Sequence, residues 1–217
     1  MNIETDLRDT LTARAKRCVR VASGHLSEGE FFLGGGAVAT RDMNDIDIYP
    51  AGDAAFTIPK GVILASSKNA TTIGNAPPLQ FCNYKRATLA QLVASFDFAH
   101  IQARAHVKDG AILSVEWTPA FVAANACRTS EFTGSDYPLS SSIRLLKYNK
   151  RGELTRHHSI HSMLNIIREI VERGFKDYED FKDQLDAVDL GLNPEELEGV
   201  VRSNVMRLFE LLRKDKP

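Results

Sequence analysis

The sequence has few cysteines and no long hydrophobic run. Its three cysteines, Cys18, Cys82 and Cys127, are far apart in the 217-residue chain and lack C-x-x-C spacing. This odd, scattered set predicts neither a disulfide framework nor a zinc site, and it is typical of a reducing compartment. Because no apolar stretch approaches the roughly 20 residues of a membrane-spanning helix, we expect no membrane partner and a cytoplasmic protein, from a bacterium or a phage-infected cell.

The sequence also lacks an excess of charge of either sign. It contains 27 Lys and Arg residues and 28 Asp and Glu residues, which gives a net charge of −1. Because the net charge gives the protein no overall electrostatic attraction for nucleic acid, any such contact needs a local basic patch. Residues 144–151 are one candidate. The other is the group Arg14, Lys16, Arg17 and Arg20, which could equally be the solvated side of an opening helix.

A glycine cluster stands between an apolar segment and a helix-forming one. Gly34, Gly35 and Gly36 follow Phe31-Phe32-Leu33 and precede Ala37-Val38-Ala39. Glycines at a strand-to-helix turn let backbone N–H groups approach an anion closely, and a following helix N-terminus adds positive dipole. The cluster predicts a phosphate-binding site, although neither the dinucleotide fingerprint nor the GxxxxGK[ST] P-loop is present.

Two aspartates follow this turn with one residue between them. In a strand, Asp45 and Asp47 share one face while Ile46 and Ile48 occupy the other. The Cα atoms of the two aspartates would lie roughly 7 Å apart, so their carboxylates can converge on one or two divalent ions. The alternative is that they form the solvated face of an edge strand whose isoleucines are buried.

These residues resemble the nucleotidyltransferases related to DNA polymerase beta. The resemblance rests on the order of Leu33-Gly34-Gly35, a stretch through Asn44, and Asp45-Ile46-Asp47. It implies that Gly34 and Gly35 bind a nucleotide and that Asp45 and Asp47 are catalytic ligands of Mg²⁺ or Mn²⁺. One departure is Gly35, because many relatives carry serine there, and its hydroxyl would contact the triphosphate.

The family also has a third carboxylate on a later strand, and Asp97 is the candidate. It stands between Phe96 and Phe98 in a segment apolar enough to be a buried strand. A charge in that setting is costly to bury without a partner. The resemblance therefore implies that Asp97 is a third catalytic and metal-binding aspartate, whereas the alternative is a strand-end aspartate that caps a turn.

A basic helix is expected near residues 138–151. Pro138 suits its first turn, Ser135 or Asp136 is a plausible cap, and Gly152 marks its end. The side chains at i, i+3, i+4 and i+7, which share one face, are Arg144, Lys147, Tyr148 and Arg151. The segment is similar to one in poly(A) polymerase and oligoadenylate synthetase relatives, which implies that these residues bind nucleotide and that Lys147 reaches the triphosphate. The alternative is an ordinary solvated helix surface.

The sequence predicts an α+β fold with a small twisted mixed sheet of the nucleotidyltransferase type. Residues 1–155 are the expected core and residues 156–217 a helical C-terminal segment packed on it. Helices are expected near 4–24, after Gly36, near 89–93 and from Pro119. Strands are expected into Gly34, at Asp45, near 61–66 and 79–83, at Asp97 and at 111–117, the last two joined through a Lys108-Asp109-Gly110 turn.

Three helices are expected in the C-terminal segment. The first ends at Gly174, the second runs from Asp177 to Gly191, and the third has Asn193 as cap and Pro194 at its first position. On the first, the apolar residues that recur at helical spacing are Ile160, Met163, Leu164, Ile167, Ile170 and Val171. A histidine group, His157, His158 and His161, could contact phosphate or, less readily, hold a metal.

Together these features imply a template-independent nucleotidyltransferase. It would move a nucleoside monophosphate from a triphosphate such as ATP onto an acceptor hydroxyl by a two-metal mechanism. The sequence does not show whether the acceptor is an RNA such as tRNA or a protein. It does not indicate the oligomeric state either. The alternative function is a catalytically silent module on the same scaffold that binds a nucleotide or a partner.

Overall fold

The computed structural model describes most of the chain as two units. It describes residues 3–26, 28–40, 43–51, 58, 60–67, 70–83, 88–127, 129, 131–152, 156–186 and 198–214, with the backbone alone at 3, 156 and 157. The internal contacts divide the chain into Met1–Cys127 and Arg128–Pro217, and each unit is considered by itself. No helix within the described ranges has the length and apolar character needed to cross a membrane.

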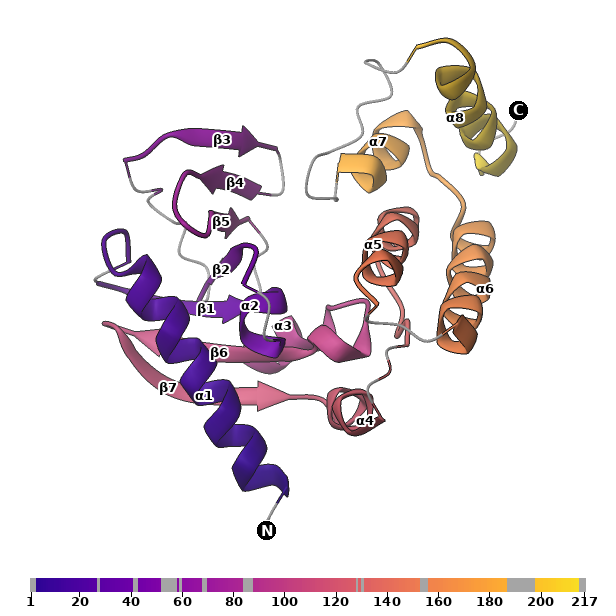
Figure 1. Ribbon diagram of the computed structural model, residues 1–217. Coiled ribbons are helices and arrows are strands. Elements are labelled where there is room, and N and C mark those ends of the chain that lie inside the picture. Colours follow the sequence, from indigo (N-terminus) through magenta and orange to yellow (C-terminus); the bar gives the residue numbers. More distant parts are fainter. Residues whose placement is uncertain are drawn as a thin grey trace. The chain divides into compact units, whose positions relative to one another are not determined.

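The first unit is built on a seven-stranded sheet with the order β3-β4-β5-β2-β1-β6-β7 (Figure 1). The strands are β1 (Glu30–Gly34), β2 (Ile46–Pro50), β3 (Ile63–Ser66), β4 (Ala70–Ile73), β5 (Leu79–Cys82), β6 (Ala103–Lys108) and β7 (Ala111–Trp117). β2 and β5 are parallel, and all other neighbours are antiparallel. The expected α+β class with a mixed sheet is therefore confirmed, and β4 is a strand that the sequence analysis missed.

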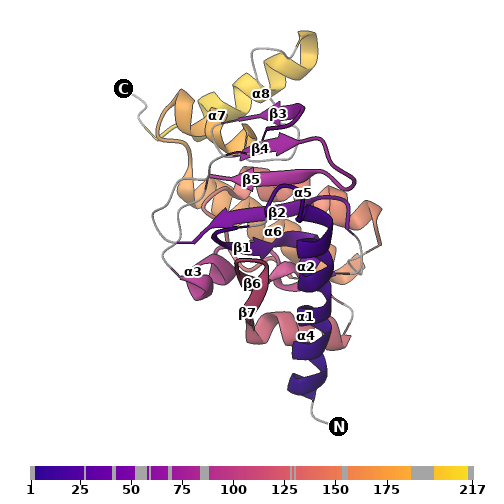
Figure 2. The ribbon, with the colours of Figure 1, turned by 90° about the vertical axis from the view of Figure 1, so that its left-hand side faces the viewer.

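Helices cover both faces of this sheet. Figure 2 shows α1 (Ile3–Ala22) and α2 (Gly35–Ala39) on one side and α3 (Leu89–Ala94) on the other. The buried residues of α1 are Leu11, Ala15, Cys18 and Ala22, whose spacing of three and four gives one apolar face. α3 packs its leucines on a sheet face that includes Phe32 and Tyr49. Its N-terminus has a capping box formed by Thr88 and Gln91.

The strands β6 and β7 form the hairpin that the sequence predicts. Asp109 and Gly110 have φ angles of 47° and 76°, the left-handed conformation that two-residue hairpin turns require. Asp109 also joins this turn to the start of β1, because its Oδ1 accepts a hydrogen bond from Gly29 N at 3.0 Å. A short 3₁₀ turn, η1 (Ala99–Ile101), precedes β6, and α4 (Pro119–Cys127) follows β7.

The second unit is helical. It contains α5 (Pro138–Lys150), α6 (Arg156–Arg173), α7 (Tyr178–Asp186) and α8 (Gly199–Leu212). Its core joins Leu139 to an aromatic group formed by Phe175, Phe181 and Phe209. The sequence analysis places the domain boundary at residue 155, whereas the structure divides the chain after Cys127, so α5 belongs to the helical unit.

The apolar side chains that recur at helical spacing on α6 are mostly exposed. Leu164 and Val171 have 62% and 59% of their side-chain surface exposed, and Ile160, Met163 and Ile167 are exposed as well. The buried side of α6 instead carries Ser162 and Ile166. The helix itself ends at Arg173, as the glycine at position 174 predicts. Gly191, Asn193 and Pro194, predicted to bound the last helices, lie outside the described residues.

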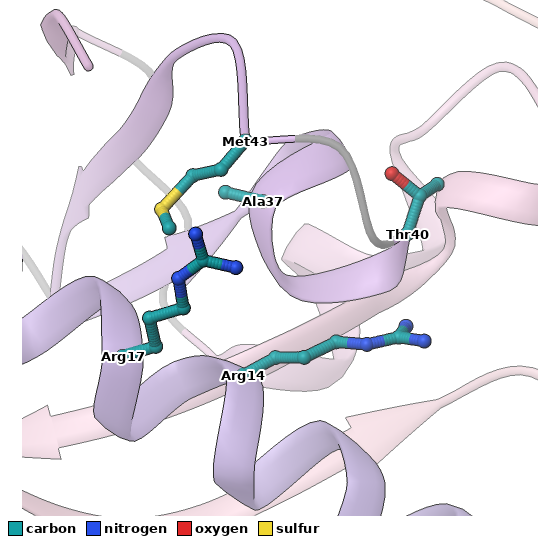
Figure 3. Close-up of a pocket in the computed structure, with 5 residues that line it drawn as sticks. All are labelled: Arg14, Arg17, Ala37, Thr40 and Met43. Atoms are coloured by element: carbon teal, nitrogen blue, oxygen red, sulfur yellow. The ribbon is translucent and has the colours of Figure 1, made fainter. Parts of the chain in front are cut away.

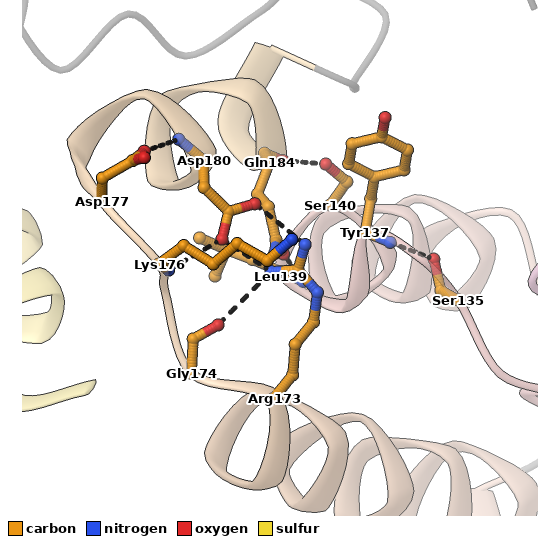
Figure 4. Close-up of polar contacts among 10 residues, drawn as sticks. All are labelled: Ser135, Tyr137, Leu139, Ser140, Arg173, Gly174, Lys176, Asp177, Asp180 and Gln184. Carbon is orange, nitrogen blue, oxygen red and sulfur yellow. Dashed lines mark hydrogen bonds and ion pairs between the residues drawn. The ribbon is translucent and has the colours of Figure 1, made fainter. Parts of the chain in front are cut away.

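Hydrogen bonds between polar side chains and backbone join α5, α6 and α7 (Figure 4). Gln184 Oε1 accepts a hydrogen bond from Leu139 N at 3.1 Å, and the Ser140 hydroxyl donates to the Gln184 carbonyl. Arg173 makes two parallel hydrogen bonds to Asp180, at 3.2 and 2.9 Å, in the bidentate arrangement that guanidinium groups favour. Before α5, the Ser135 hydroxyl accepts from Tyr137 N at 2.9 Å, as expected for a residue near its start.

The Arg173–Asp180 pair makes the second unit sensitive to pH. Burial alone would raise the pKa of Asp180, but hydrogen bonds from Arg173 and Lys176 N outweigh it and hold the pKa below its usual range. A carboxyl whose pKa is depressed by folding stabilises the folded state above its unfolded pKa, about 3.9 for Asp. That contribution is lost as the pH falls through the folded-state pKa.

We expect Asp180→Asn to lower the free energy of unfolding by about 1–3 kcal/mol at pH 7, because Arg173 loses a charged acceptor. The difference from the unsubstituted protein should shrink below about pH 4. Urea unfolding at several pH values measures both effects. Glu179→Gln, at an exposed neighbour on the same helix, removes the same charge and should have little effect. Equal losses in both variants would contradict this account.

Candidate functional site

Asp45 and Asp47 lie at the start of β2 and are both half-buried. Asp47 is paired with Gly34 on β1 and with Gln80 on β5, so it sits in the middle of the sheet. Ile46 and Ile48 are completely buried. The alternation that the sequence predicts is thus observed, and the strand lies too deep in the sheet to be the edge strand of the alternative interpretation.

The carboxylate of Asp47 lies directly against the backbone of Gly35. Gly35 has a φ of +67°, and a Cβ added there would stand 1.8 Å from Asp47 Oδ2. A side chain at this position would be strained by the positive φ and would force the carboxylate to move. The departure noted in the sequence therefore has a physical cause: a serine at position 35 would displace the carboxylate that the site is built around.

Gly34 makes room for a second charged side chain. A Cβ at Gly34 would lie 2.4 Å from Arg104 Nε. The pairing of Leu33 with Ala105 brings Arg104 level with Gly34 on the neighbouring strand, where side chains of opposed residues point to the same face. Asp47, Gly34 and Arg104 consequently form one row across β2, β1 and β6, in which only the middle position has no side chain.

Arg104 is fully buried. Its Nη1 donates to the carbonyl of Ile101 at 2.8 Å and to that of Ala103. Its guanidinium carbon stacks on the ring of Phe96 and lies 5.8 Å from the ring centroid of Tyr49. A buried positive charge held by carbonyls and aromatic faces raises the local potential near the row in which Asp47 stands.

The two aspartates act electrostatically on the same buried thiol. Burial is the main reason that the pKa of Cys82 lies well above its usual range, and the negative charges of Asp47 and Asp45 raise it further. Arg104 has the opposite effect on the pKa of Cys82. Burial likewise raises the pKa of Tyr49, with a contribution from Asp47. Both aspartates and the arginine are thus close enough to influence one side chain.

The residue beside Asp47 on β5 has a neutral amide side chain. Gln80 is opposite Asp47 in the parallel pair, so their side chains share a face. Gln80 Nε2 donates to Thr72 Oγ1 at 3.4 Å. Across the sheet, the aspartate therefore has a glutamine on one side and a glycine on the other, and neither neighbour adds a carboxylate.

The expected strand at Asp97 is wrong. Asp97 lies in a bend between α3 and η1, and β6 begins only at Ala103. Gln102 Nε2 donates to the Phe96 carbonyl at 2.7 Å, and Ile101 N donates to the Phe98 carbonyl at 3.2 Å, so the segment folds back on itself instead of extending. Asp97 is nearly fully buried, with 3% of its surface exposed.

No group of three His, Cys, Asp or Glu side chains that could hold a metal ion occurs among the described residues. The structure brings Asp45 and Asp47 together at the glycine turn, but it does not join Asp97 to them in such a group. Asp97 is held in a bend rather than on a strand beside β2. A role for Asp97 in the reaction stays a prediction.

The basic residues predicted for nucleotide binding are on α5 in the second unit. Arg144 and Lys147 are half-buried, and Arg151 is exposed at the C-terminal cap. Tyr148, however, is only 7% exposed. The proposed basic and aromatic face is therefore a basic one, since its tyrosine belongs to the packed side of the helix. The binding roles of these residues are not tested by the structure.

The histidine group has protein partners in the described part of the unit. His158 Nε2 lies 3.7 Å from Glu131 Oε1, and His161 Nε2 lies 2.9 Å from Asn165 Nδ2. The side chain of His157 lies outside the described residues. A contact of this group with phosphate stays an untested alternative.

The sequence analysis missed Gln80 and Arg104 as parts of the site. In β6, Arg104 and His106 alternate with small or apolar residues, a pattern that predicts an exposed polar face. Only the strand pairing and the bare Gly34 reveal that Arg104 is buried. A signal for Gln80 exists in the sequence, because Leu79-Gln80-Phe81 places one polar residue within a short apolar strand.

Comparisons with known proteins find similarity in structure but not in sequence. No protein-family model matches the sequence, and no curated protein does. The structure is similar to that of a CCA-adding enzyme in complex with CTP, with a TM-score of 0.48 and 11% sequence identity. The similarity covers 94% of this chain and 54% of that one, so the chain spans about half the length of that protein.

The close approach at Gly35 predicts a large effect of a single methyl group. Gly35→Ala should cost more stability than Gly110→Ala, since both have a positive φ but only Gly35 faces a carboxylate. We expect about 1–2 kcal/mol for Gly110→Ala from the left-handed conformation alone. Gly24→Ala, with open space around it and no positive φ, should be nearly neutral.

A double variant identifies the cause. In an Asp47→Ala background, Gly35→Ala should cost only about as much as Gly110→Ala, because the colliding oxygen is gone. Chemical unfolding of the four variants and their combination measures these differences. An equally large cost in both backgrounds would show that the carboxylate is not what confines position 35 to glycine.

Proposed function

We propose that this chain is a template-independent nucleotidyltransferase, which moves a nucleoside monophosphate from a triphosphate onto an acceptor hydroxyl. The observation that carries the proposal is the position of the Asp47 carboxylate against the Gly34–Gly35 turn, with Asp45 two residues before it. A strand, a glycine turn and paired carboxylates bring anionic phosphate and acidic ligands to one place. This is the arrangement that the resemblance to nucleotidyltransferases implies.

The two carboxylates suit a magnesium ion whose remaining ligands come from the substrate and water. Mg²⁺ is usually bound by one or two carboxylates together with phosphate oxygens and water, rather than by a cage made only of protein groups. Asp45 and Asp47 provide two hard oxygen ligands, so a pair without a third carboxylate fits this ion or Mn²⁺. Divalent ions held there would supply charge neutralisation of the triphosphate and activation of the acceptor hydroxyl.

The chain's own groups would bind and orient the nucleotide. The left-handed conformation of Gly35 turns successive backbone N–H groups toward one side, which favours binding of a phosphate. Asp47 is held between this turn and the Gln80 strand position, so its carboxylate needs little reorganisation when substrate arrives. Asp97 is proposed as a third acidic group that accepts the proton of the acceptor hydroxyl.

The acceptor and the biological setting are further proposals. An RNA such as tRNA, or a protein side chain, would present the attacking hydroxyl, and the nucleotide would be a triphosphate such as ATP. A cytoplasmic setting, in a bacterium or a phage-infected cell, accords with the free thiols of Cys18, Cys82 and Cys127.

A second function is a catalytically silent module that binds a nucleotide or a partner. The observation that favours it is Gln80, a neutral side chain at the sheet position beside Asp47. Such a module would bind a triphosphate but transfer nothing. Binding without turnover therefore separates the two functions.

Replacing either aspartate of the pair should abolish transfer without unfolding the chain. We expect Asp45→Asn and Asp47→Asn each to lower metal-dependent transfer on the order of 100-fold or more. Incubation with each labelled triphosphate, total cell RNA and protein measures transfer and shows which acceptor carries the label. Asp9→Asn, at an exposed site on α1, is the charge-matched control.

Thermal shifts complete this test. Triphosphate should stabilise the unsubstituted protein only with Mg²⁺ or Mn²⁺ present, and this stabilisation should disappear in Asp45→Asn. Stabilisation with no transfer to any acceptor would favour the silent module. Unchanged transfer in both aspartate variants would refute the proposed function.

Lys147 gives an independent test of nucleotide binding by the second unit. We expect Lys147→Gln to raise the KM for triphosphate roughly tenfold, the effect of losing one charge-assisted hydrogen bond. Lys150→Gln, three residues on and exposed, is the control. Equal KM values for the two variants would mean that the basic face of α5 is an ordinary solvated surface.

A further inference from the structure

A small basic hollow lies between α1 and α2 in the first unit (Figure 3). Its volume is about 200 Å³, and it is lined by Arg14, Arg17, Ala37, Thr40 and Met43. We propose that this hollow binds a phosphate group. Sites for whole small-molecule ligands are usually about 300–1,000 Å³, so this one is too small for a nucleoside triphosphate and suits a single phosphate or similar oxyanion.

The first arginine of the hollow is held in place by the end of α2. Arg14 Nη1 donates to the carbonyl of Ala39 at 2.5 Å and, more weakly, to that of Val38 at 3.4 Å. These bonds fix the guanidinium beside the last turn of α2 before any ligand arrives. A donor group whose position is already fixed loses less conformational entropy on binding an anion.

The second arginine comes from the next turn of the same helix. Arg17 is exposed, and Figure 3 shows its guanidinium group beside Met43 and Ala37. The spacing i, i+3 puts Arg14 and Arg17 on one side of α1. Among the described residues that line the hollow, two carry a guanidinium group and none carries a carboxylate. Guanidinium is the side-chain group best matched to phosphate oxygens.

Thr40 restricts the chemistry of the ligand further. Its hydroxyl donates to the Gly36 carbonyl at 2.9 Å, so its single proton is already used. Among the described lining residues, the side-chain donors left for a ligand are thus those of the arginines. A ligand that carries acceptor oxygens and negative charge is favoured over one that must itself donate.

The hollow and the aspartate pair are joined by α2. This helix begins at Gly35, which touches Asp47, and ends at Ala39 before Thr40. Five helical residues span about 7.5 Å. A nucleic acid whose end lies at the aspartates could therefore place a backbone phosphate in the hollow, and free phosphate or pyrophosphate offers the same group. The inference itself does not depend on catalysis.

Binding of three probes to matched variants tests the inference. Isothermal titration with inorganic phosphate and pyrophosphate, and fluorescence anisotropy with a labelled single-stranded RNA, are carried out without metal. Arg17→Gln removes the exposed arginine of the hollow, and Arg20→Gln removes an exposed arginine one turn further along α1 that does not line it. Because Arg14 also holds α2, its replacement could alter the fold, and Arg14 is left intact.

We expect Arg17→Gln to weaken binding of at least one probe about tenfold or more, and Arg20→Gln less than twofold. If Arg17→Gln weakens the binding of RNA alone, the hollow binds a backbone phosphate. If it weakens the binding of phosphate or pyrophosphate, the hollow binds a free anion. Equal effects of the two variants on all probes, or no binding of any probe, would overturn the inference. The effect of Arg17→Gln on binding should be the same in an Asp47→Asn background. A protein without transferase activity would therefore still show the predicted phosphate binding.

Discussion

The Asp47 carboxylate and the Gly35 backbone occupy adjoining space, and this constraint organises the candidate site. A left-handed residue must follow β1 so that the chain can turn into α2, and only glycine leaves room for the carboxylate beside that turn. The strand β2 in turn holds Asp47 opposite Gly34 through its pairing with β1. The left-handed conformation of Gly35, the register of β1 with β2 and the position of the Asp47 side chain therefore depend on one another.

The same row of the sheet explains how charges are distributed around the site. Gly34 has no side chain, and its place is taken by Arg104 from the next strand. Burial of a guanidinium is costly unless it finds partners. Here Nη1 of Arg104 donates to the carbonyls of Ile101 and Ala103, and the ring of Phe96 stacks on the group. On the other side of Asp47, β5 supplies the neutral Gln80. In this row of the sheet, Asp47 is thus flanked by a neutral amide on one side and, beyond Gly34, by a guanidinium on the other.

Much of the fold follows from local patterns in the sequence. The turn at Asp109-Gly110, the proline-started helices α4 and α5 and the glycine at the end of α6 are where propensity and turn chemistry place them. Alternation of aspartate and isoleucine also predicts correctly which side of β2 is buried. These features depend on interactions between residues close in sequence, which composition and spacing record.

Long-range features of the site could not be read in the same way. Arg104 looks like an exposed residue until the strand pairing brings it over Gly34. In the sequence, Asp97 looks like part of a strand because its neighbours are two phenylalanines, but the hydrogen bond from Gln102 to Phe96 accompanies a bend in that segment. On α6, the buried positions are Ser162 and Ile166, whereas most apolar residues with helical spacing are exposed. Each error arises where a tertiary hydrogen bond or packing contact outweighs local preference.

The most direct test of the central claim is a crystal structure with Mn²⁺ and a non-hydrolysable nucleoside triphosphate, examined by anomalous scattering. The account predicts an anomalous peak coordinated directly by the carboxylates of Asp45 and Asp47, with phosphate oxygens of the nucleotide beside the Gly34–Gly35 turn. A bound nucleotide with no peak at these two carboxylates, or with its phosphates far from the glycine turn, would contradict it.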